Sequence, residues 1–204
     1  MEKKIAKLLL QINAIKLEPE KLFTWASGKK SPIYCDNRLT LSYPKVRDCI
    51  QKGLFEIYQN YFKHSDVIAG VATGGIPHGS ILANNLNLPF IYLRDTAKKH
   101  GRKNRIEGEV KPKSNVLVIE DLVSTGKSSL NAIEPLLEIG CNITGILSIF
   151  TYNFPDALNI IKQKGINFKS LCTYEELIKT ATEEGFISKE ELHFLEKWNK
   201  DFKI

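Results

Sequence analysis

The sequence lacks the short signatures of several common cofactor, metal and thiol chemistries. It has only four cysteines, Cys35, Cys49, Cys141 and Cys172, and their wide spacing fits neither a zinc site nor a CxxC redox pair. GxGxxG and HExxH motifs are absent as well, which excludes the usual dinucleotide-binding and zinc-protease patterns. We interpret Cys141 and Cys172, which have apolar neighbours, as small core residues.

Long hydrophobic runs are also missing. The start of the chain, MEKKIAKLLLQINAIKL, is interrupted by Gln11, Asn13 and Lys16, too soon for the apolar core of a signal peptide. No run approaches the roughly 20 apolar residues of a membrane-spanning helix. We therefore expect a cytoplasmic protein that does not enter a membrane.

The positive charge is concentrated in one place. The chain of 204 residues carries a formal charge of +6, and a strongly basic segment lies between Arg94 and Arg105. Its cations, set against the single acid Asp95, are Arg94, Lys98, Lys99, Arg102, Lys103 and Arg105. A concentrated local field suits a compact polyanion such as a polyphosphate at least as well as DNA. We expect small-molecule substrates and no nucleic acid.

Hydrophobic periodicity predicts alternating strands and helices. Apolar, mostly β-branched runs predict strands at 66–71, 90–93, 116–119, 144–151 and 167–171. Helical patterns are predicted at 44–61, 79–87, 128–139 and 155–164. This alternation indicates an α/β fold with a doubly wound, mostly parallel sheet flanked by helices.

Two further segments flank this core. Before it, the helical spacing of Ile5, Leu8, Leu9, Ile12 and Ile15 predicts an amphipathic helix. The stretch FTWASGKKSPIYCDNR then suggests a hairpin-like element. After it, the capping signatures TYEE and SKEE predict two more helices. We expect one domain over 1–204, comprising an N-terminal helix and hood (1–43), the α/β core (44–172) and C-terminal helices (173–204).

The stretch VLVIEDLVSTGKSS, Val116 to Ser129, is the centre of the functional argument. A buried strand leads to two carboxylates, Glu120 and Asp121, and then to a small-residue turn that opens a helix. Backbone N–H groups at a helix N-terminus bind anions. The adjacent acids suggest that the ligand also presents hydroxyl groups, as a ribose phosphate does. Asp121 replaces the first glycine of a Walker A loop, so an ATP-binding P-loop is excluded.

Two other segments are expected at the same edge of the sheet, where the carboxyl ends of parallel strands meet. The turn Thr73-Gly74-Gly75 can offer backbone N–H groups to a phosphate, although a tight turn alone would also need glycine. The basic segment after Arg94 either closes over a polyphosphate as a loop or is a solvated run of charge.

Together these residues resemble a known family. VLVIEDLVSTGKS looks like the phosphoribosyl-pyrophosphate (PRPP) signature of the type I phosphoribosyltransferases. FTWASGKKSPIYCDNR resembles the hood segment of orotate phosphoribosyltransferases, and RDTAKKHGRKNRIEG resembles their catalytic loop. The resemblance implies the type I phosphoribosyltransferase fold. It also implies an enzyme that combines PRPP with orotate, with Mg²⁺ bound mainly through the diphosphate.

The resemblance also assigns residues. Glu120 and Asp121 are expected to hold the ribose hydroxyls, and Ser124 is expected near orotate. The PRPP-binding set implied by the family is Arg94, Lys98, His100, Glu120, Asp121, Leu122, Val123, Ser124, Thr125, Gly126, Lys127 and Ser128. The catalytic set is Lys98, His100 and Asp121, and no residue is expected to bind a metal directly.

Lys98 and His100 are expected to reach the neighbouring subunit's site, which makes a homodimer the functional unit. The chain departs from some members of the family at Ala26, Tyr34-Cys35, Asp95 and near Tyr152. Two alternatives stay open: a phosphoribosyltransferase for another base such as a purine, and a regulator that senses PRPP without turnover.

Overall fold

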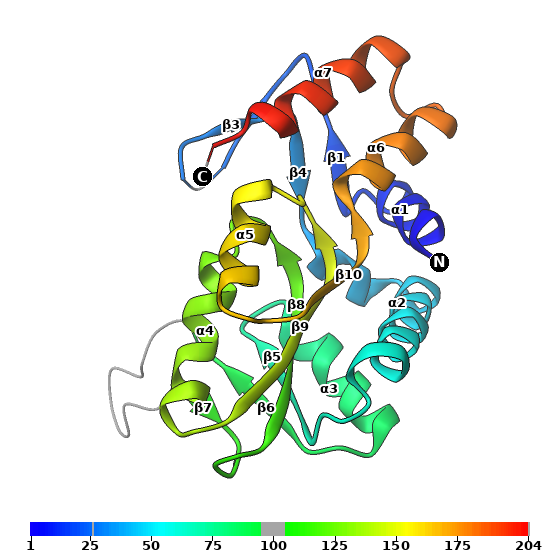
Figure 1. Cartoon of the computed structure of the whole chain (residues 1–204). Helices are drawn as coiled ribbons and strands as arrows, with labels where there is room; N and C mark the ends of the chain where they lie inside the picture. The colour runs from blue at the N-terminus through cyan, green and yellow to red at the C-terminus, as the bar shows by residue number, and fades with distance from the viewer. Residues whose placement is uncertain (26, 95–104, 204) are drawn as a thin grey trace.

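The fold is built on a six-stranded sheet (Figure 1), described in a computed structural model that covers residues 1–25, 27–94 and 105–203. The strand order is β10-β9-β8-β5-β6-β7, and every neighbouring pair is parallel except β6 and β7. The strands are β5 (Val67–Val71), β6 (Phe90–Leu93), β7 (Ile106–Glu107), β8 (Asn115–Val123), β9 (Asn142–Thr151) and β10 (Phe168–Thr173). The predicted doubly wound, mostly parallel sheet is confirmed.

Helices cover both faces of this sheet, as Figure 1 shows. The core helices are α2 (Pro44–Ile57), α3 (Gly75–Leu86), α4 (Lys127–Glu138) and α5 (Pro155–Gln163). A π-helical turn, Tyr58–Phe62, extends α2. Alternate residues of β8 face the two helical layers on opposite sides of the sheet. Leu117 belongs to the core under α2 and α3, whereas Val118 belongs to the core under α4 and α5. This is why its central residues are uniformly apolar.

The strand order creates a switch point between β5 and β8. From β5 the chain proceeds to β6 on one side, and it later resumes at β8 on the other. The helix after β5, α3, lies on one face, and α4, which follows β8, lies on the opposite face. A crevice at the carboxyl ends of the strands forms at such a point, and ligands bind there in open α/β sheets.

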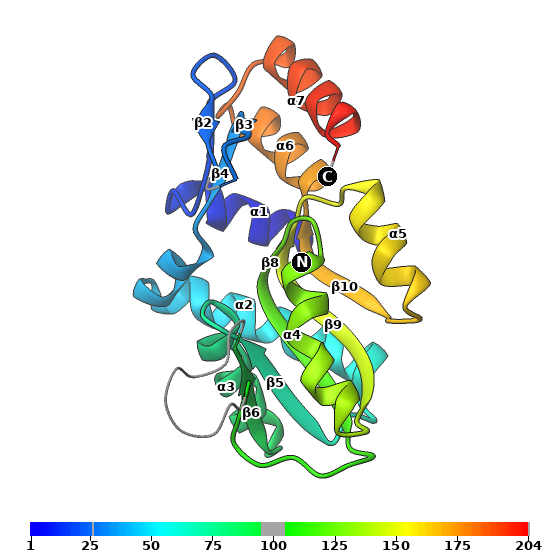
Figure 2. The same ribbon diagram turned by 90° about the vertical axis from the view of Figure 1, so that its left-hand side faces the viewer.

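The hood and the C-terminal helices lie together at one end of the sheet (Figure 2). The hood contains an antiparallel hairpin of β2 (Phe23–Thr24) and β3 (Lys30–Ser31), as predicted. Its other pair joins β1 (Ile15–Leu17) to β4 (Ile33–Cys35). The flanking helices are α1 (Glu2–Gln11), the 3-10 helix η1 (Asn37–Ser42), α6 (Tyr174–Glu183) and α7 (Lys189–Asp201). None of the helices in the described part of the chain is long and apolar enough to span a bilayer.

Several predicted boundaries are wrong for identifiable reasons. The first helix does not reach Ile15, because Asn13 adopts φ 56° and turns the chain into β1. Asparagine tolerates this left-handed conformation better than most residues. Helix α3 begins at Gly75 rather than Gly79, because Pro77 lies in the first turn, where no intrahelical N–H is needed.

The capping signatures have different outcomes. Ser188 and Glu191 form the full reciprocal box that was predicted for α7. At α6 only half of it forms: Thr173 accepts from the Glu176 backbone, but its own N–H donates to Glu2 of α1 at 2.9 Å. A proline inside a helix often ends it at the preceding residue. Pro135 does not, because α4 continues past it to Glu138.

Candidate active site at the sheet switch point

The two acids of the central stretch lie inside strand β8, not beyond its end as predicted. The Glu120 side chain is buried, and its Oε1 accepts a 2.7 Å hydrogen bond from the Ser129 hydroxyl of α4. Asp121 is half-buried, and burial raises the pKa of its carboxyl group above the ordinary value. The two acids therefore differ: Glu120 ties the strand to α4, whereas Asp121 remains partly accessible at the crevice.

The turn after β8 provides a helix N-terminus at the same edge. Gly126 has φ +75° and precedes α4, whose first residue is Lys127. The Thr125 hydroxyl lies 3.5 Å from the Lys127 backbone nitrogen, while Lys127 and Ser128 are exposed. The N–H groups of the first turn of a helix have no intrahelical partner and favour an anion. A helix N-terminus therefore lies at the predicted position, directly after the turn.

The glycine turn after β5 packs directly against Asp121. A Cβ added at Gly74 would overlap the Asp121 carboxylate, and one added at Gly75 would overlap the carbonyl oxygen of Ile119. Both glycines are therefore required by the close approach of β5 and β8. The two segments expected to meet at the switch point do meet there.

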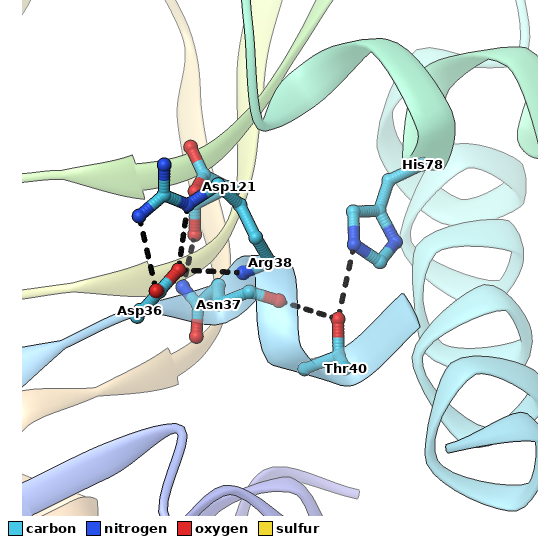
Figure 3. Close-up of polar contacts among 6 residues, drawn as sticks. All are labelled: Asp36, Asn37, Arg38, Thr40, His78 and Asp121. Atoms are coloured by element: carbon cyan, nitrogen blue, oxygen red, sulfur yellow. Dashed lines mark hydrogen bonds and ion pairs between the residues drawn. The ribbon is translucent and has the colours of Figure 1, made fainter. Parts of the chain in front are cut away.

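A buried polar network, which sequence reasoning missed, approaches this site from the hood (Figure 3). Asn37 Nδ2 donates to the main-chain carbonyl of Asp121 at 2.6 Å, and the Thr40 hydroxyl donates to the Asn37 carbonyl at 2.6 Å. Thr40 Oγ1 also lies 3.2 Å from His78 Nε2 on α3. The Asn37 and Asp121 positions are 84 residues apart, so no local pattern could have revealed the contact.

The protonation of this network follows from its geometry. Thr40 has one hydroxyl proton and gives it to Asn37, so His78 must donate from Nε2. His78 Nδ1 then accepts from Gln51 Nε2 at 3.5 Å. Burial, followed by the nearby Arg47, lowers the pKa of His78 to about 4, so the ring is neutral at physiological pH. Neutral histidine is what this donor–acceptor pattern requires.

Two arginines border the basic segment. Arg94 follows β6, and its guanidinium lies 3.7 Å from the Glu107 carboxylate of β7. Arg105 lies 3.6 Å from Glu134 of α4 and also donates to the Asn131 carbonyl. Arg105, which was counted with the basic segment but not with the PRPP-binding residues, therefore anchors the chain before β7 to α4. Lys98 and His100 lie outside the described residues.

The hood is held by an aromatic cluster. The Trp25 ring contacts Tyr152 at a centroid distance of 5.2 Å and Phe202 at 5.5 Å, and its indole N–H donates to the Ile33 carbonyl at 3.1 Å. The other members of this aromatic cluster are Phe150, Phe154, Tyr174 and Trp198. The cluster joins the hairpin, the end of β9 and the C-terminal helix α7.

Comparisons with known proteins agree with this geometry. The family model described as the phosphoribosyl transferase domain matches residues 41–154. An orotate phosphoribosyltransferase of Phocaeicola vulgatus is 49% identical over 98% of this chain and 95% of its own. The chain belongs to the orotate phosphoribosyltransferase family.

Solved structures support the same family. The crystal structure of orotate phosphoribosyltransferase from Aeropyrum pernix matches with a TM-score of 0.78 and 28% identity, covering 90% of this chain and 99% of that one. The UMP synthase of Leishmania donovani matches with a TM-score of 0.83 and 26% identity, covering 98% of this chain and 42% of that one.

The structure shows the surroundings of several residues at which this chain departs from some members of the family. Tyr34 is 42% exposed and lies 5.6 Å from the Phe23 ring, so it presents an aromatic surface at the hood. Cys35 is half-buried, and burial and then Asp121 raise its thiol pKa. Tyr152 is a buried member of the aromatic cluster, which explains why no charged side chain occupies that position. Ala26 and Asp95 lie outside the described residues.

Proposed function

We propose that this chain transfers the 5-phosphoribosyl group from PRPP to orotate, forming orotidine 5′-monophosphate and diphosphate for pyrimidine biosynthesis. The observation that carries the proposal is the meeting of a helix N-terminus, a half-buried aspartate and a glycine turn at the β5–β8 switch point. The helix N-terminus and the glycine turn offer N–H groups to phosphate oxygens. The aspartate matches the ribose hydroxyls and the sugar carbon that becomes positive.

In the proposed reaction, the bond between ribose C1 and the diphosphate oxygen breaks, and its electron pair leaves with diphosphate. Orotate N1 releases its proton to solvent and forms the new bond to C1. The turn from Ser124 to Ser128 holds the 5′-phosphate, and Asp121 holds the ribose hydroxyls near the carbon that becomes positive. Interactions that strengthen as charge develops lower the barrier. Ser124 also faces orotate in this proposal.

The leaving diphosphate is assigned to positive groups. Arg94 lies at the end of β6, and Lys98 and His100 complete the set. Mg²⁺, when bound, neutralises charge that develops on the diphosphate. Mg²⁺ keeps several waters and is commonly bound through substrate phosphates, so the ion is assigned to the diphosphate and Asp121 stays with the ribose hydroxyls. Within the described residues, no three His, Cys, Asp or Glu side chains form a metal-binding group.

The test of the function is incubation with PRPP, Mg²⁺ and a panel of bases, following diphosphate release. We expect release with orotate and none above background with guanine, hypoxanthine or adenine. Turnover with a purine and not with orotate would assign the chain to a purine branch. PRPP binding without turnover of any base would instead indicate a regulator.

The proposal includes a homodimer in which Lys98 and His100 of one subunit complete the partner's site. This can be tested by mixing two inactive variants, Lys98→Ala and Asp121→Asn, after subunit exchange. A mixed dimer places both defects in one site and leaves the other intact, so about a quarter of the wild-type activity should return. No recovery after proven exchange would show that each site is built from one chain.

The proposed setting is the reducing cytoplasm. All four cysteines are free thiols, and three of them, Cys49, Cys141 and Cys172, are buried. Burial raises the thiol pKa of Cys141 and Cys172, which makes the reactive thiolate scarce. These residues serve packing and need no oxidising compartment.

A further inference from the structure

A side chain from the hood bonds to the backbone of β8 near the carboxyl end of the strand. Asn37 is 1% exposed, and its amide nitrogen reaches the Asp121 carbonyl at 2.6 Å. The residue lies at the start of η1, between the hood strand β4 and α2. A side chain from the hood therefore contacts the backbone of the residue that holds the ribose in the proposed reaction.

Asn37 is itself rigidly placed. Its carbonyl accepts from Thr40, which is bonded to His78, and Gln51 Nε2 donates to the His78 carbonyl at 3.3 Å. These three partners come from η1, α3 and α2, and all are buried. The His78 ring is neutral and fully buried. Each of its nitrogens therefore has one fixed role, with Nε2 donating to Thr40 and Nδ1 accepting from Gln51. The position of Asn37 is therefore fixed by both helices on this face of the sheet.

Among the described residues, the network leaves two buried acceptors without a partner, Asn37 Oδ1 and Gln51 Oε1. Such an atom costs stability, and a leucine of similar size in place of Asn37 would avoid that cost. The Asn37 amide is therefore poorly explained by packing alone. The Asn37 amide nitrogen, in contrast, donates to the Asp121 carbonyl.

We infer that Asn37 is a positioning residue that fixes the Asp121 backbone, so that the carboxylate faces the ribose across the Gly74 turn. The inference rests on the proposed function, because it acts through Asp121. It also assigns the hood a second role: besides lying over the base, the hood holds the ribose-binding acid in place. Asn37 does not touch substrate, since it is almost completely enclosed.

The experiment compares two variants that each remove a side-chain donor to a β8 carbonyl. Asn37→Leu removes the bond to Asp121 near the end of the strand. Thr144→Val removes the 3.1 Å bond to Val116 at the beginning of the strand, together with a 2.8 Å hydrogen bond to the Ser65 hydroxyl, and both lie remote from the site. We expect Asn37→Leu to lower kcat about 100-fold with a smaller change in KM for PRPP, because small displacements of reacting groups carry such costs. Thr144→Val should lower the melting temperature and leave kcat unchanged.

A double-mutant cycle with Asp121→Asn separates positioning from a general effect on the fold. If Asn37 acts through the Asp121 carboxylate, Asn37→Leu should lower kcat little further once that carboxylate is gone. Additive losses in kcat, or a wild-type kcat for Asn37→Leu, would overturn the inference. Failure of the proposed function would be recognised separately, because the wild-type chain would then release no diphosphate with orotate.

Discussion

The edge of the sheet where β8 leads into α4 and the hood are built in opposite ways. The edge uses consecutive residues: strand β8 ends at Val123, the turn follows, and α4 begins at Lys127. The hood depends on contacts between distant residues, because Trp25 packs against Tyr152 and Phe202. One region is encoded locally and the other by tertiary packing.

In the proposed function, this difference separates the two substrates. The PRPP site would depend on the strand, turn and helix around the end of β8 and on the few residues that contact Asp121, because the sheet sets its backbone. An orotate site that depends on the hood should respond to any change that loosens the aromatic cluster. The bond from Asn37 to Asp121 is the point at which the two regions meet.

The largest expected effect is at the edge itself. Asp121→Asn should lower kcat by on the order of 100-fold or more, since it removes a charge aimed at the transition state. Burial raises the pKa of Asp121 in the folded state, so the ionised carboxylate costs stability once the pH exceeds that pKa. The variant should therefore melt no lower than wild type at neutral pH, and any gain should vanish in acid, where Asp121 is protonated.

Melting curves across pH and steady-state rates with orotate would check this prediction. A wild-type rate for Asp121→Asn would contradict the mechanism. A lower melting temperature at neutral pH would show that the carboxylate has a stabilising partner that outweighs its burial.

A somewhat smaller kinetic loss is expected at the glycine turn. Gly74→Ala adds a methyl group where the Asp121 carboxylate lies, so the acid must move, and kcat should fall roughly 100-fold or less. Gly185→Ala is the matched control: its φ of +76° is unfavourable for alanine, but no atom lies within 4 Å of the added carbon. The control should lose about 1 kcal/mol of stability and keep its kcat. Equal kinetic losses in both variants would refute the specific role of the turn.

The hood should show the reverse pattern. Trp25→Ala removes contacts with Tyr152 and Phe202 and should destabilise the fold by about 3 kcal/mol. KM for orotate should rise by on the order of tenfold, or about 1.4 kcal/mol, while KM for PRPP changes less. Phe186→Ala, at a side chain that is 47% exposed, should change neither constant. Equal increases in both KM values after Trp25→Ala would show that the two regions are not separable.

The same distinction explains how far the sequence could predict the structure. The strand, turn and helix from Val116 to Ser128 were predictable because strand period, small residues and helix signals follow one another in the chain. The βα alternation likewise predicted the sheet. The positions of Glu120 and Asp121 within β8 were missed, because polar residues at a strand end look like the beginning of a loop.

The remaining features depend on tertiary contacts. Asn37 and His78 carry no local signal of a shared network, since their partners lie on other elements. The turn at Asn13 was hidden by a helical spacing that continues by coincidence to Ile15. From the sequence, Tyr152 marked only a departure from some members of the family. Its packing among the aromatic rings of the cluster could be recognised only in the fold.

The smallest expected effect tests whether the beginning of α7 matters to the hood. Ser188→Ala removes the capping box, in which Ser188 accepts from Glu191 N–H at 3.2 Å and Glu191 accepts from Ser188 N–H at 2.7 Å. The loss should be about 1 kcal/mol of unfolding free energy, measured by denaturant titration. Because Trp198 and Phe202 contact the hood from the other end of α7, neither KM should change. A rise in KM for orotate would mean that fraying at Ser188 spreads through the whole helix, and that the hood is coupled to α7 as one unit.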